Sequence, residues 1–254
     1  MRFCVFIFTV LFVSACSDQV LLNGDPVAGI GGAAPALADQ AQVSRNVLVV
    51  GGTKGVGLEV VRLAAERGHK VTAVARRPER MTFMHDNLET LAGNILDQER
   101  IAELVKGQDV IVSAIGIGPT RDKVTVFSQG MGNVLDAIRS EGSAARIISV
   151  TGIGAGDSRG HGGFFYDRIF LPLALKTVYD DKDIQEQALR DSDTNWTIVR
   201  PGFLSDEQSL GAYRVIGDMT GIVSGKISRA DVAHFVVAAM ENGQYIKETV
   251  LLTN

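Results

Sequence analysis

The chain has 254 residues, of which 46% are hydrophobic and 21% are charged, and its formal net charge is −4. This length and composition suit one globular domain with a large core and some chain to spare. A mildly acidic chain without a basic block argues against nucleic-acid binding, so we expect no nucleic acid among its partners.

The N-terminus has the pattern of an export signal. Met1-Arg2 precedes an apolar run from Phe3 to Val13, and small residues stand before Cys16. A run of about 11 residues is too short to span a bilayer as a helix but suits a signal-peptide core. The pattern predicts a signal peptide and lipobox at 1–16, lipidation of Cys16, and a bacterial lipoprotein anchored on the periplasmic side. The alternatives are a start codon assigned too early, which predicts a cytoplasmic protein, and a plain signal peptide cut after Ala38.

Residues 17–44 are rich in Gly, Ala, Asp and Gln without periodicity, which predicts a flexible tether. Cys4 and Cys16 are the only cysteines, so we expect no disulfide and no thiolate chemistry in the folded part. The 4 histidines show no metal-ligand spacing, and no metal site is predicted.

From Arg45 onward, strand-like and helix-like segments alternate. The strands are expected at Val47–Val50, Lys70–Ala75, Leu88–Ala92, Asp109–Ala114, Arg146–Thr151, Thr197–Arg200 and Thr249–Leu252. The helices are expected at Val56–Arg67, Gln98–Val105, Val124–Ser140, Asp181–Asp191 and Ala230–Met240. Several strands are almost wholly apolar, as strands covered on both faces are. The pattern predicts an α/β fold at 45–254: a single Rossmann-like, doubly wound parallel sheet of about seven strands with helices on both faces.

A glycine-rich turn joins the first strand to the first helix. It reads Gly51-Gly52-Thr53-Lys54-Gly55-Val56-Gly57. Glycine permits a tight reversal and a close approach to phosphate, and the first N–H groups of the helix lack internal partners and carry partial positive charge. The strand before and the helix after satisfy the context that this motif requires. All residues of the turn are therefore predicted to bind a dinucleotide.

The end of the second strand indicates which dinucleotide. An NAD site usually offers an acidic side chain here to the ribose 2′-hydroxyl, whereas this chain has Arg76 and Arg77. Guanidinium groups hold a 2′-phosphate through charge-assisted hydrogen bonds, and Lys54 is expected near the same phosphate. The pattern predicts NADP(H); the alternative is that these cations are solvated surface charges.

Further cofactor contacts are predicted from position alone, because ligands of such sheets bind at the carboxyl ends of the strands. Asn94 follows the third strand and is expected to reach adenine. Ala114, Ile115 and Gly116 end the fourth strand and should run past the ribose. Thr151 ends the fifth strand beside the expected nicotinamide position.

Together these residues resemble the atypical short-chain dehydrogenase/reductase superfamily, in particular its NAD(P)H-binding group around biliverdin reductase B and flavin reductase. Besides the glycine turn, the resemblance rests on the segments 178–190, 196–201, 206–213 and 227–233. It covers roughly residues 45–254. It implies a Rossmann unit that binds NADPH and passes hydride to a flavin-like or other conjugated small molecule.

The catalytic candidates are Thr151, Tyr179 and Lys182. The family's Tyr-x-x-x-Lys pair, in which lysine lowers the pKa of the tyrosine, is one residue short here, and Gly152 stands where the biliverdin-reductase group has serine. The alternatives are that Thr151 only caps a strand end and that Tyr179 and Lys182 lie on an exposed helix start. Two functions stay open: an NADPH-dependent reductase, and a non-catalytic NADP-binding sensor or assembly factor.

The segment 158–166, Ser-Arg-Gly-His-Gly-Gly-Phe-Phe-Tyr, is glycine-rich and ends in aromatic residues. It is expected to be either a lid over the acceptor or a solvent loop with a small hydrophobic anchor.

Overall fold

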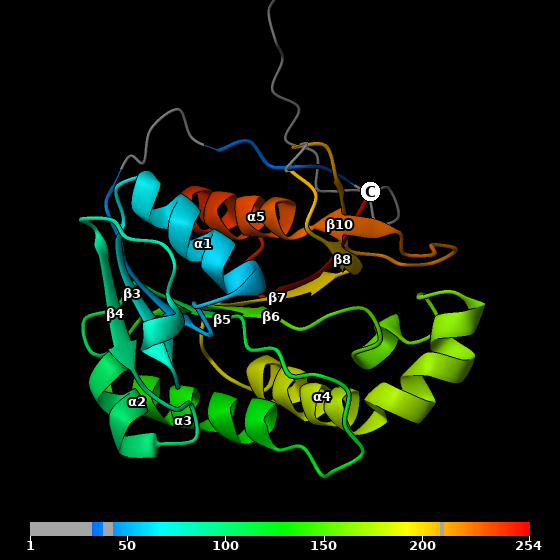
Figure 1. Cartoon of the computed structure of the whole chain (residues 1–254), viewed down its shortest axis with the longest axis horizontal. Helices are drawn as coiled ribbons and strands as arrows, with labels where there is room; N and C mark the ends of the chain where they lie inside the picture. The colour runs from blue at the N-terminus through cyan, green and yellow to red at the C-terminus, as the bar shows by residue number, and fades with distance from the viewer. Residues whose placement is uncertain (1–31, 38–42, 209–210) are drawn as a thin grey trace, which may run out of the picture.

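The computed structural model describes residues 32–37, 43–208 and 211–254 (Figure 1). The predicted signal peptide and lipobox, Cys16 included, lie outside these residues, as does most of the predicted tether. Export and lipid attachment therefore stay predictions. Within the described ranges, no helix is long and apolar enough to cross a membrane.

A nine-stranded sheet forms the centre of the molecule. Its strands are β1 (Gly32–Ala33), β2 (Asn46–Val50), β3 (Lys70–Ala75), β4 (Leu88–Ala92), β5 (Val110–Ser113), β6 (Arg146–Val150), β7 (Trp196–Pro201), β9 (Arg214–Ile216) and β11 (Glu248–Thr253). They are ordered β1-β9-β11-β7-β6-β5-β2-β3-β4. Neighbours from β11 to β4 are parallel, whereas β9 is antiparallel to both β11 and β1. Two further strands, β8 (Phe203–Ser205) and β10 (Lys226–Ser228), pair separately in parallel.

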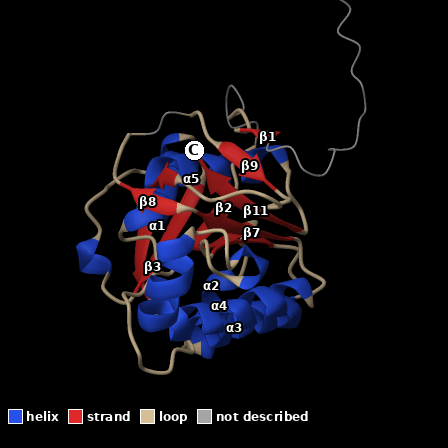
Figure 2. Cartoon of the chain, turned by 90° about the vertical axis from the view of Figure 1, so that its right-hand side faces the viewer, coloured by secondary structure: helices blue, strands red, loops and turns tan. Residues whose placement is uncertain are grey.

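Helices cover both faces of the sheet, as Figure 2 shows with the strands in red between them. The helices are α1 (Gly55–Glu66) and α5 (Arg229–Asn242) on one face, and α2 (Gln98–Val105), α3 (Val126–Glu141) and α4 (Lys176–Arg190) on the other. Along β2, Val47 and Val49 pack in the core under α1 and α5, while Leu48 and Val50 pack in the core over α2 and α3. This alternation explains why the strand is apolar throughout. The predicted doubly wound α/β fold is confirmed.

The differences from the predicted elements lie in short or irregular segments. β1, β8, β9 and β10 were not predicted, since strands of two or three residues show no readable alternation. The same holds for the 3₁₀ turns η1 (Pro78–Arg80) and η2 (Gly156–Ser158) and for the wide π-helical segment η3 (Tyr166–Leu175), which contains Pro172. α4 begins at Lys176 instead of Asp181.

Part of the predicted tether belongs to the sheet, which corrects the assignment of 17–44. β1 pairs with β9, and Ala34 and Leu37 pack against the core. The carbonyl oxygen of Ala36 accepts a hydrogen bond of 2.9 Å from Asn242 Nδ2. β1 consists of small residues at the edge of the sheet and is held by backbone pairing with β9, so the sequence shows no alternation of apolar and polar side chains there.

The chain reverses its direction of travel across the sheet between β2 and β5. It runs from β2 out to β3 and β4, and then returns to place β5 on the other side of β2. The connections that leave the carboxyl ends of β2 and β5 therefore diverge and open a crevice. Gly57 lets α1 start against the turn after β2, because a β-carbon here would lie 2.3 Å from the carbonyl oxygen of Gly51.

We predict that Gly57→Ala lowers the free energy of unfolding by about 2 kcal/mol or more, since the added methyl group overlaps backbone that cannot move away. The matched control is Gly132→Ala in α3, where a β-carbon meets nothing within 4 Å. This change should stabilise the protein by about 0.5–1 kcal/mol through helix propensity. Chemical denaturation of both variants checks the pair, and equal effects would contradict the packing argument.

Candidate functional site

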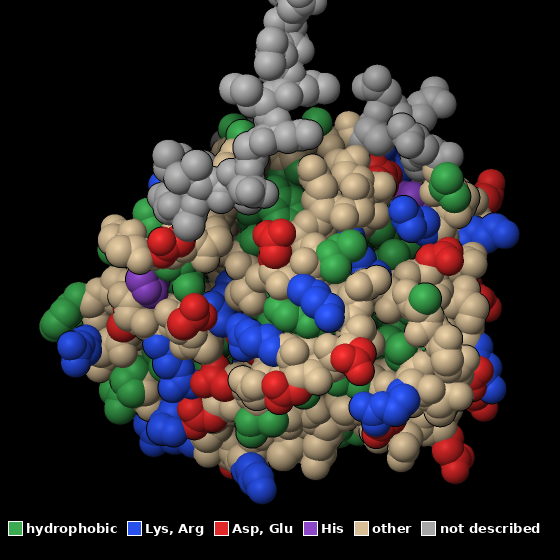
Figure 3. Space-filling model, turned by 180° about the vertical axis from the view of Figure 1, so that it is seen from behind, with side chains coloured by type: hydrophobic (Ala, Val, Ile, Leu, Met, Phe, Trp, Pro, Cys, Tyr) green, Lys and Arg blue, Asp and Glu red, His purple; other side chains and the backbone are tan. Residues whose placement is uncertain are grey.

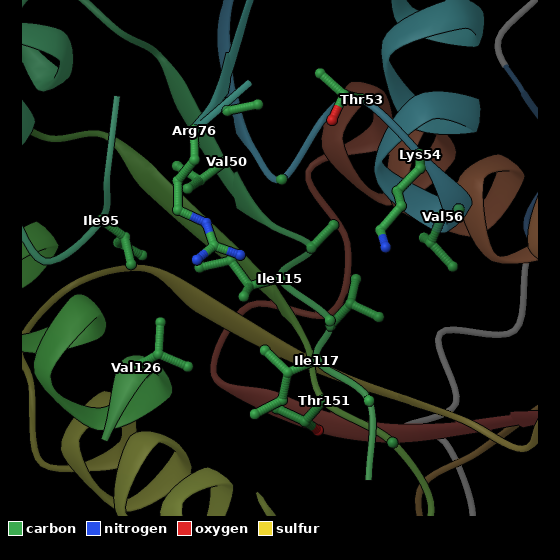
Figure 4. A pocket seen from close by; sticks show the side chains of 18 of the residues that line it. Val50, Thr53, Lys54, Val56, Arg76, Ile95, Ile115, Ile117, Val126 and Thr151 are labelled. Atoms are coloured by element: carbon green, nitrogen blue, oxygen red, sulfur yellow. The ribbon is translucent and has the colours of Figure 1, made fainter. Parts of the chain in front are cut away.

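A cleft of ≈ 1090 Å³ opens at the carboxyl ends of the parallel strands. This exceeds the ~300–1,000 Å³ usual for a small-molecule pocket. Its lining includes every predicted cofactor residue except Gly52 and Gly57, and also all three predicted catalytic residues. Figure 4 shows Lys54 and Arg76 reaching toward one space from opposite sides, with Ile115, Ile117 and Thr151 further along it.

The glycine turn presents backbone N–H groups to this cleft. Thr53, Lys54, Gly55 and Val56 line it at the start of α1. α1 has no side-chain cap and no acidic residue in its first turn, unlike α2, where Asp97 caps the helix by accepting from Arg100 N. The first N–H groups of α1 are thus left for an anionic ligand.

Gly52 and Gly57 have a packing role and do not line the cleft, and their contact with a cofactor stays a prediction. A β-carbon on Gly52 would lie 3.0 Å from side-chain atoms of both Ala73 and Val61, and Gly57 abuts Gly51. Both residues set how close α1 approaches the sheet. Gly51 itself lines the cleft with a φ of +87°, and a β-carbon on it would lie 2.8 Å from the carbonyl oxygen of Ala114.

Cations dominate one end of the cleft. Lys54, Arg76, Arg77 and Arg80 all line it and are exposed, and no carboxylate of the described residues forms an ion pair with them. The face seen in Figure 3, by contrast, carries cationic and acidic side chains interspersed. A group of unpaired cations beside uncapped N–H groups attracts a ligand with several negative charges. Sequence reasoning missed Arg80, which follows the predicted Arg-Arg pair by one turn of η1.

The remaining predicted cofactor residues lie along the cleft floor. Asn94 is exposed, and its Oδ1 accepts a hydrogen bond of 3.2 Å from Leu96 N. Ala114 N donates to Val50 O at 2.9 Å, which holds the end of β5 against β2. Ile115 and Gly116 follow in the lining. Their individual contacts with a cofactor stay predictions.

The three predicted catalytic residues meet at the other end. Lys182 Nζ donates to the carbonyl oxygen of Thr151 and lies 5.0 Å from the ring centroid of Tyr179. The hydroxyl of Tyr179 lies 2.9 Å from the place a β-carbon on Gly152 would take. The absence of a side chain at Gly152 is thus what lets the Tyr179 hydroxyl approach the end of β6.

Tyr179 and Lys182 are buried, so the alternative of an exposed helix start is wrong. Because α4 begins at Lys176, both residues lie inside the helix, and their spacing of three residues puts them on one face. Glu186 and Leu189 continue this buried face at the helical period. That spacing was the signal that could have identified Glu186.

Burial sets the protonation of this pair. Desolvation lowers the pKa of Lys182 to about 8, with the nearby Glu186 acting in the opposite direction. Burial also raises the pKa of Tyr179; a hydrogen bond with Tyr166 opposes the rise, and the charge of Glu186 adds to it. Tyr179 therefore keeps its hydroxyl proton near neutral pH, whereas Lys182 titrates close to the working range of a general acid.

Beneath the cleft lies a buried ion pair that sequence reasoning missed. Glu186 Oε1 accepts from Thr151 Oγ1 at 2.7 Å and from Arg200 Nε at 3.0 Å, and its Oε2 accepts from Arg190 Nη2 at 2.9 Å. Although burial opposes it, the Arg200 guanidinium keeps the pKa of Glu186 below its ordinary value. The hydroxyl of Thr151 is thus already held by a carboxylate, which favours the interpretation of this residue as a strand-end anchor.

The aromatic segment after β6 is anchored at Tyr166, whose hydroxyl donates to Ile153 O at 2.9 Å and whose ring packs edge-on against Phe203 at 5.1 Å. Phe164 and Phe165 are each 75% exposed. The contacts of Tyr166 agree with the predicted hydrophobic anchor, whereas the residues from Tyr166 onward form η3 instead of a loop. Across the described ranges, no cluster of histidine, cysteine or acidic residues could hold a metal ion.

Comparison with known proteins agrees with this geometry. Residues 51–243 match the NAD(P)H-binding family. The chain belongs to that family. It is 27% identical over 202 residues to an uncharacterized sugar epimerase of Bacillus subtilis, YhfK, covering 77% of this chain and 88% of YhfK.

Two solved structures share the fold. ChuY, an anaerobillin reductase of Escherichia coli O157:H7, is 23% identical with a TM-score of 0.68, covering 82% of this chain and 96% of ChuY. SP1627 of Streptococcus pneumoniae TIGR4, a candidate NADH-flavin reductase, is 23% identical with a TM-score of 0.66, covering 83% of this chain and all of SP1627. The predicted NAD(P)H-binding Rossmann fold and its family are confirmed.

The lowered pKa of Lys182 predicts a pH-dependent stability. Between about 8 and the unfolded value of 10.5, the unfolded chain binds this proton more than the native protein does. The free energy of unfolding that this group contributes therefore rises with pH across that window and is constant below it.

We expect the free energy of unfolding of the wild type to rise relative to that of Lys182→Met by on the order of 3 kcal/mol between pH 8 and pH 10.5. Denaturant titrations at several pH values measure it. The exposed Lys176→Met is the control for the loss of one lysine. A pH-independent difference would contradict a buried, titrating amine.

Proposed function

We propose that this protein is an NADPH-dependent reductase that transfers hydride to a flavin-like or other conjugated small molecule. The observation that carries the proposal is one cleft with unpaired cations at its β3 end and a buried Tyr179–Lys182 pair at its β6 end. The family match supports a nicotinamide cofactor. The preference for NADP(H) rests on the cations.

The residues present fit such a cofactor. The uncapped N-terminus of α1 would receive the diphosphate, and Arg76 and Arg77 would receive the 2′-phosphate, with Lys54 and Arg80 adding positive charge. Glu79 follows in η1 but does not line the cleft. No carboxylate at the end of β3 would therefore repel a 2′-phosphate.

The cofactor, when bound, supplies a hydride, and this chain's residues position the partners and handle protons. Tyr179 keeps its hydroxyl proton and can donate a hydrogen bond to an acceptor oxygen or nitrogen. The Lys182 ammonium lies against the Tyr179 ring and carries a proton below pH about 8. Thr151 is held by Glu186, so its part is to fix the end of β6.

The acceptor side of the cleft is apolar. Ile117 and Val126 line it with Tyr179 and pack against the apolar cluster that contains Tyr179. Such a surface suits a planar, conjugated molecule better than a sugar, whose hydroxyl groups need hydrogen-bond partners. The names of ChuY and SP1627, an anaerobillin reductase and a candidate flavin reductase, point to the same class.

One observation favours the second candidate, a non-catalytic NADP-binding sensor or assembly factor. Thr151 is committed to Glu186 and Gly152 has no side chain, so neither residue after β6 offers a free polar group to a substrate. Turnover separates the two functions.

We predict that Arg76→Gln/Arg77→Gln weakens NADPH binding by about 10- to 100-fold and leaves NADH binding within about twofold, because charge-assisted hydrogen bonds to a phosphate contribute ~1.5–3 kcal/mol. Isothermal titration calorimetry with both nucleotides measures this. Arg139→Gln, an exposed arginine of α3 remote from the cleft lining, controls for net charge. A wild type that prefers NADH would refute the assignment of NADP(H).

We further predict flavin-dependent oxidation of NADPH by the wild type, followed as loss of absorbance at 340 nm in a panel of flavins, quinones and linear tetrapyrroles. Tyr179→Phe should lower kcat by about 10²-fold or more if its hydroxyl serves proton transfer, while the Kd for NADPH stays unchanged. Tight NADPH binding with no turnover across the panel would favour the non-catalytic candidate.

A further inference from the structure

Arg229 reaches the start of α1 from the neighbouring helix α5, which lies on the same face of the sheet. It is the first residue of α5 and lines the cleft. Its Nε lies 3.7 Å and its Cδ 3.9 Å from the place that a β-carbon on Gly55 would take. Gly55 begins α1, so the Arg229 side chain lies over the helix N-terminus that the other observations assign to a diphosphate.

In this structure Arg229 forms an ion pair with Asp206, which is highly exposed to solvent. Arg229 Nη1 is 2.6 Å from Asp206 Oδ1, and the side chain of Asp206 is 90% exposed against 29% for that of Arg229. An ion pair with a carboxylate so open to water contributes little net stability. Among the described residues that line this cleft, Asp206 is the one carboxylate, and it holds the guanidinium whose side chain lies over the start of α1.

The start of α5 does not depend on Arg229. Ser228 caps the helix, its Oγ accepting from Asp231 N at 2.9 Å. Apart from Asp206, no acceptor among the described residues bonds the Arg229 guanidinium, so the remaining donors of its planar fork are available to a second anion. The position of the partly buried Arg229 side chain beside the glycine turn therefore suits ligand binding, and it is not needed to hold α5 in place.

We propose that Arg229 binds the diphosphate of the dinucleotide and that Asp206 is the counter-ion it leaves in doing so. This inference rests on the proposed dinucleotide binding and adds to it a residue outside the glycine turn. It also divides the cations by task. Arg76 and Arg77 distinguish NADPH from NADH, whereas Arg229 contacts the part that both nucleotides share.

The test is a double-mutant cycle in the full chain, with Kd values for NADPH and NADH from calorimetry. Arg229→Gln should weaken both nucleotides equally, by about tenfold, which corresponds to ~1.4 kcal/mol. Asp206→Asn should tighten both by about two- to fivefold. In the Arg229→Gln background, the effect of Asp206→Asn should vanish, because Asp206 acts by occupying Arg229.

Two further variants make the outcome specific. Arg229→Lys keeps the positive charge but loses the planar guanidinium with its several donors, so its Kd should lie between those of the wild type and Arg229→Gln. Arg76→Gln should weaken NADPH alone, which separates the two classes of cation. Circular dichroism and the melting temperature of each variant establish that it is folded.

Unchanged affinity of Arg229→Gln for both nucleotides would overturn the inference while leaving the proposed function in place. If Asp206→Asn still tightens binding in the Arg229→Gln background, Asp206 acts by repelling the nucleotide directly. That result would overturn the inference that Arg229 leaves Asp206 to bind the diphosphate. A wild type that binds neither nucleotide would overturn the proposed function itself, and with it this inference.

Discussion

The whole site depends on how closely the N-terminus of α1 approaches the turn after β2. Gly57 lies against Gly51, and Gly51 lies against the end of β5, at distances that leave no room for a β-carbon. The first residues of α1 line the cleft and no side chain caps the helix, so its first N–H groups are left for a ligand. Lys54, Arg76 and Arg229 come from three different segments, yet all three converge on the space defined by this contact. A wider turn would leave them as unrelated surface cations.

A second constraint lies below the cleft, where Glu186 joins α4 to the ends of β6 and β7. Two buried charges are costly unless each is fully hydrogen-bonded, and here Glu186 accepts from Thr151, Arg190 and Arg200. The network fixes the strand end whose carbonyl oxygen holds Lys182. Burial lowers the pKa of that lysine, and the charge of Glu186 opposes the change. Burial of Lys182 costs stability wherever the amine is charged, and it leaves a side chain whose pKa is lowered to about 8 beside Tyr179.

Sequence patterns predicted the elements that have long periodic repeats, such as the buried strands β2 and β5 and the amphipathic α1. They did not predict β8, β9 or η3, whose residues pair or pack with partners remote in the chain. The same reason explains the site. Arg76 and Lys54 could be read from their place in a βα unit, whereas Arg229 and Glu186 become visible only when α5 and α4 are packed on the sheet. For Gly52 and Gly57, the motif alone does not distinguish a glycine that packs against the sheet from one that also contacts a ligand, and their tight packing became visible only in the fold.

By itself the sequence determined the fold class, the NAD(P)H-binding family and the group of cations around the glycine turn and the end of β3, because strand, turn and helix N-terminus are consecutive in the chain and act through backbone geometry. Tertiary structure decided what surrounds that local unit. It buried Tyr179 and Lys182 together, tied Thr151 to Glu186, and brought Arg229 over Gly55 from more than half the chain away. These contacts join residues with no fixed spacing in sequence, so only the packing of helices on the sheet could establish them.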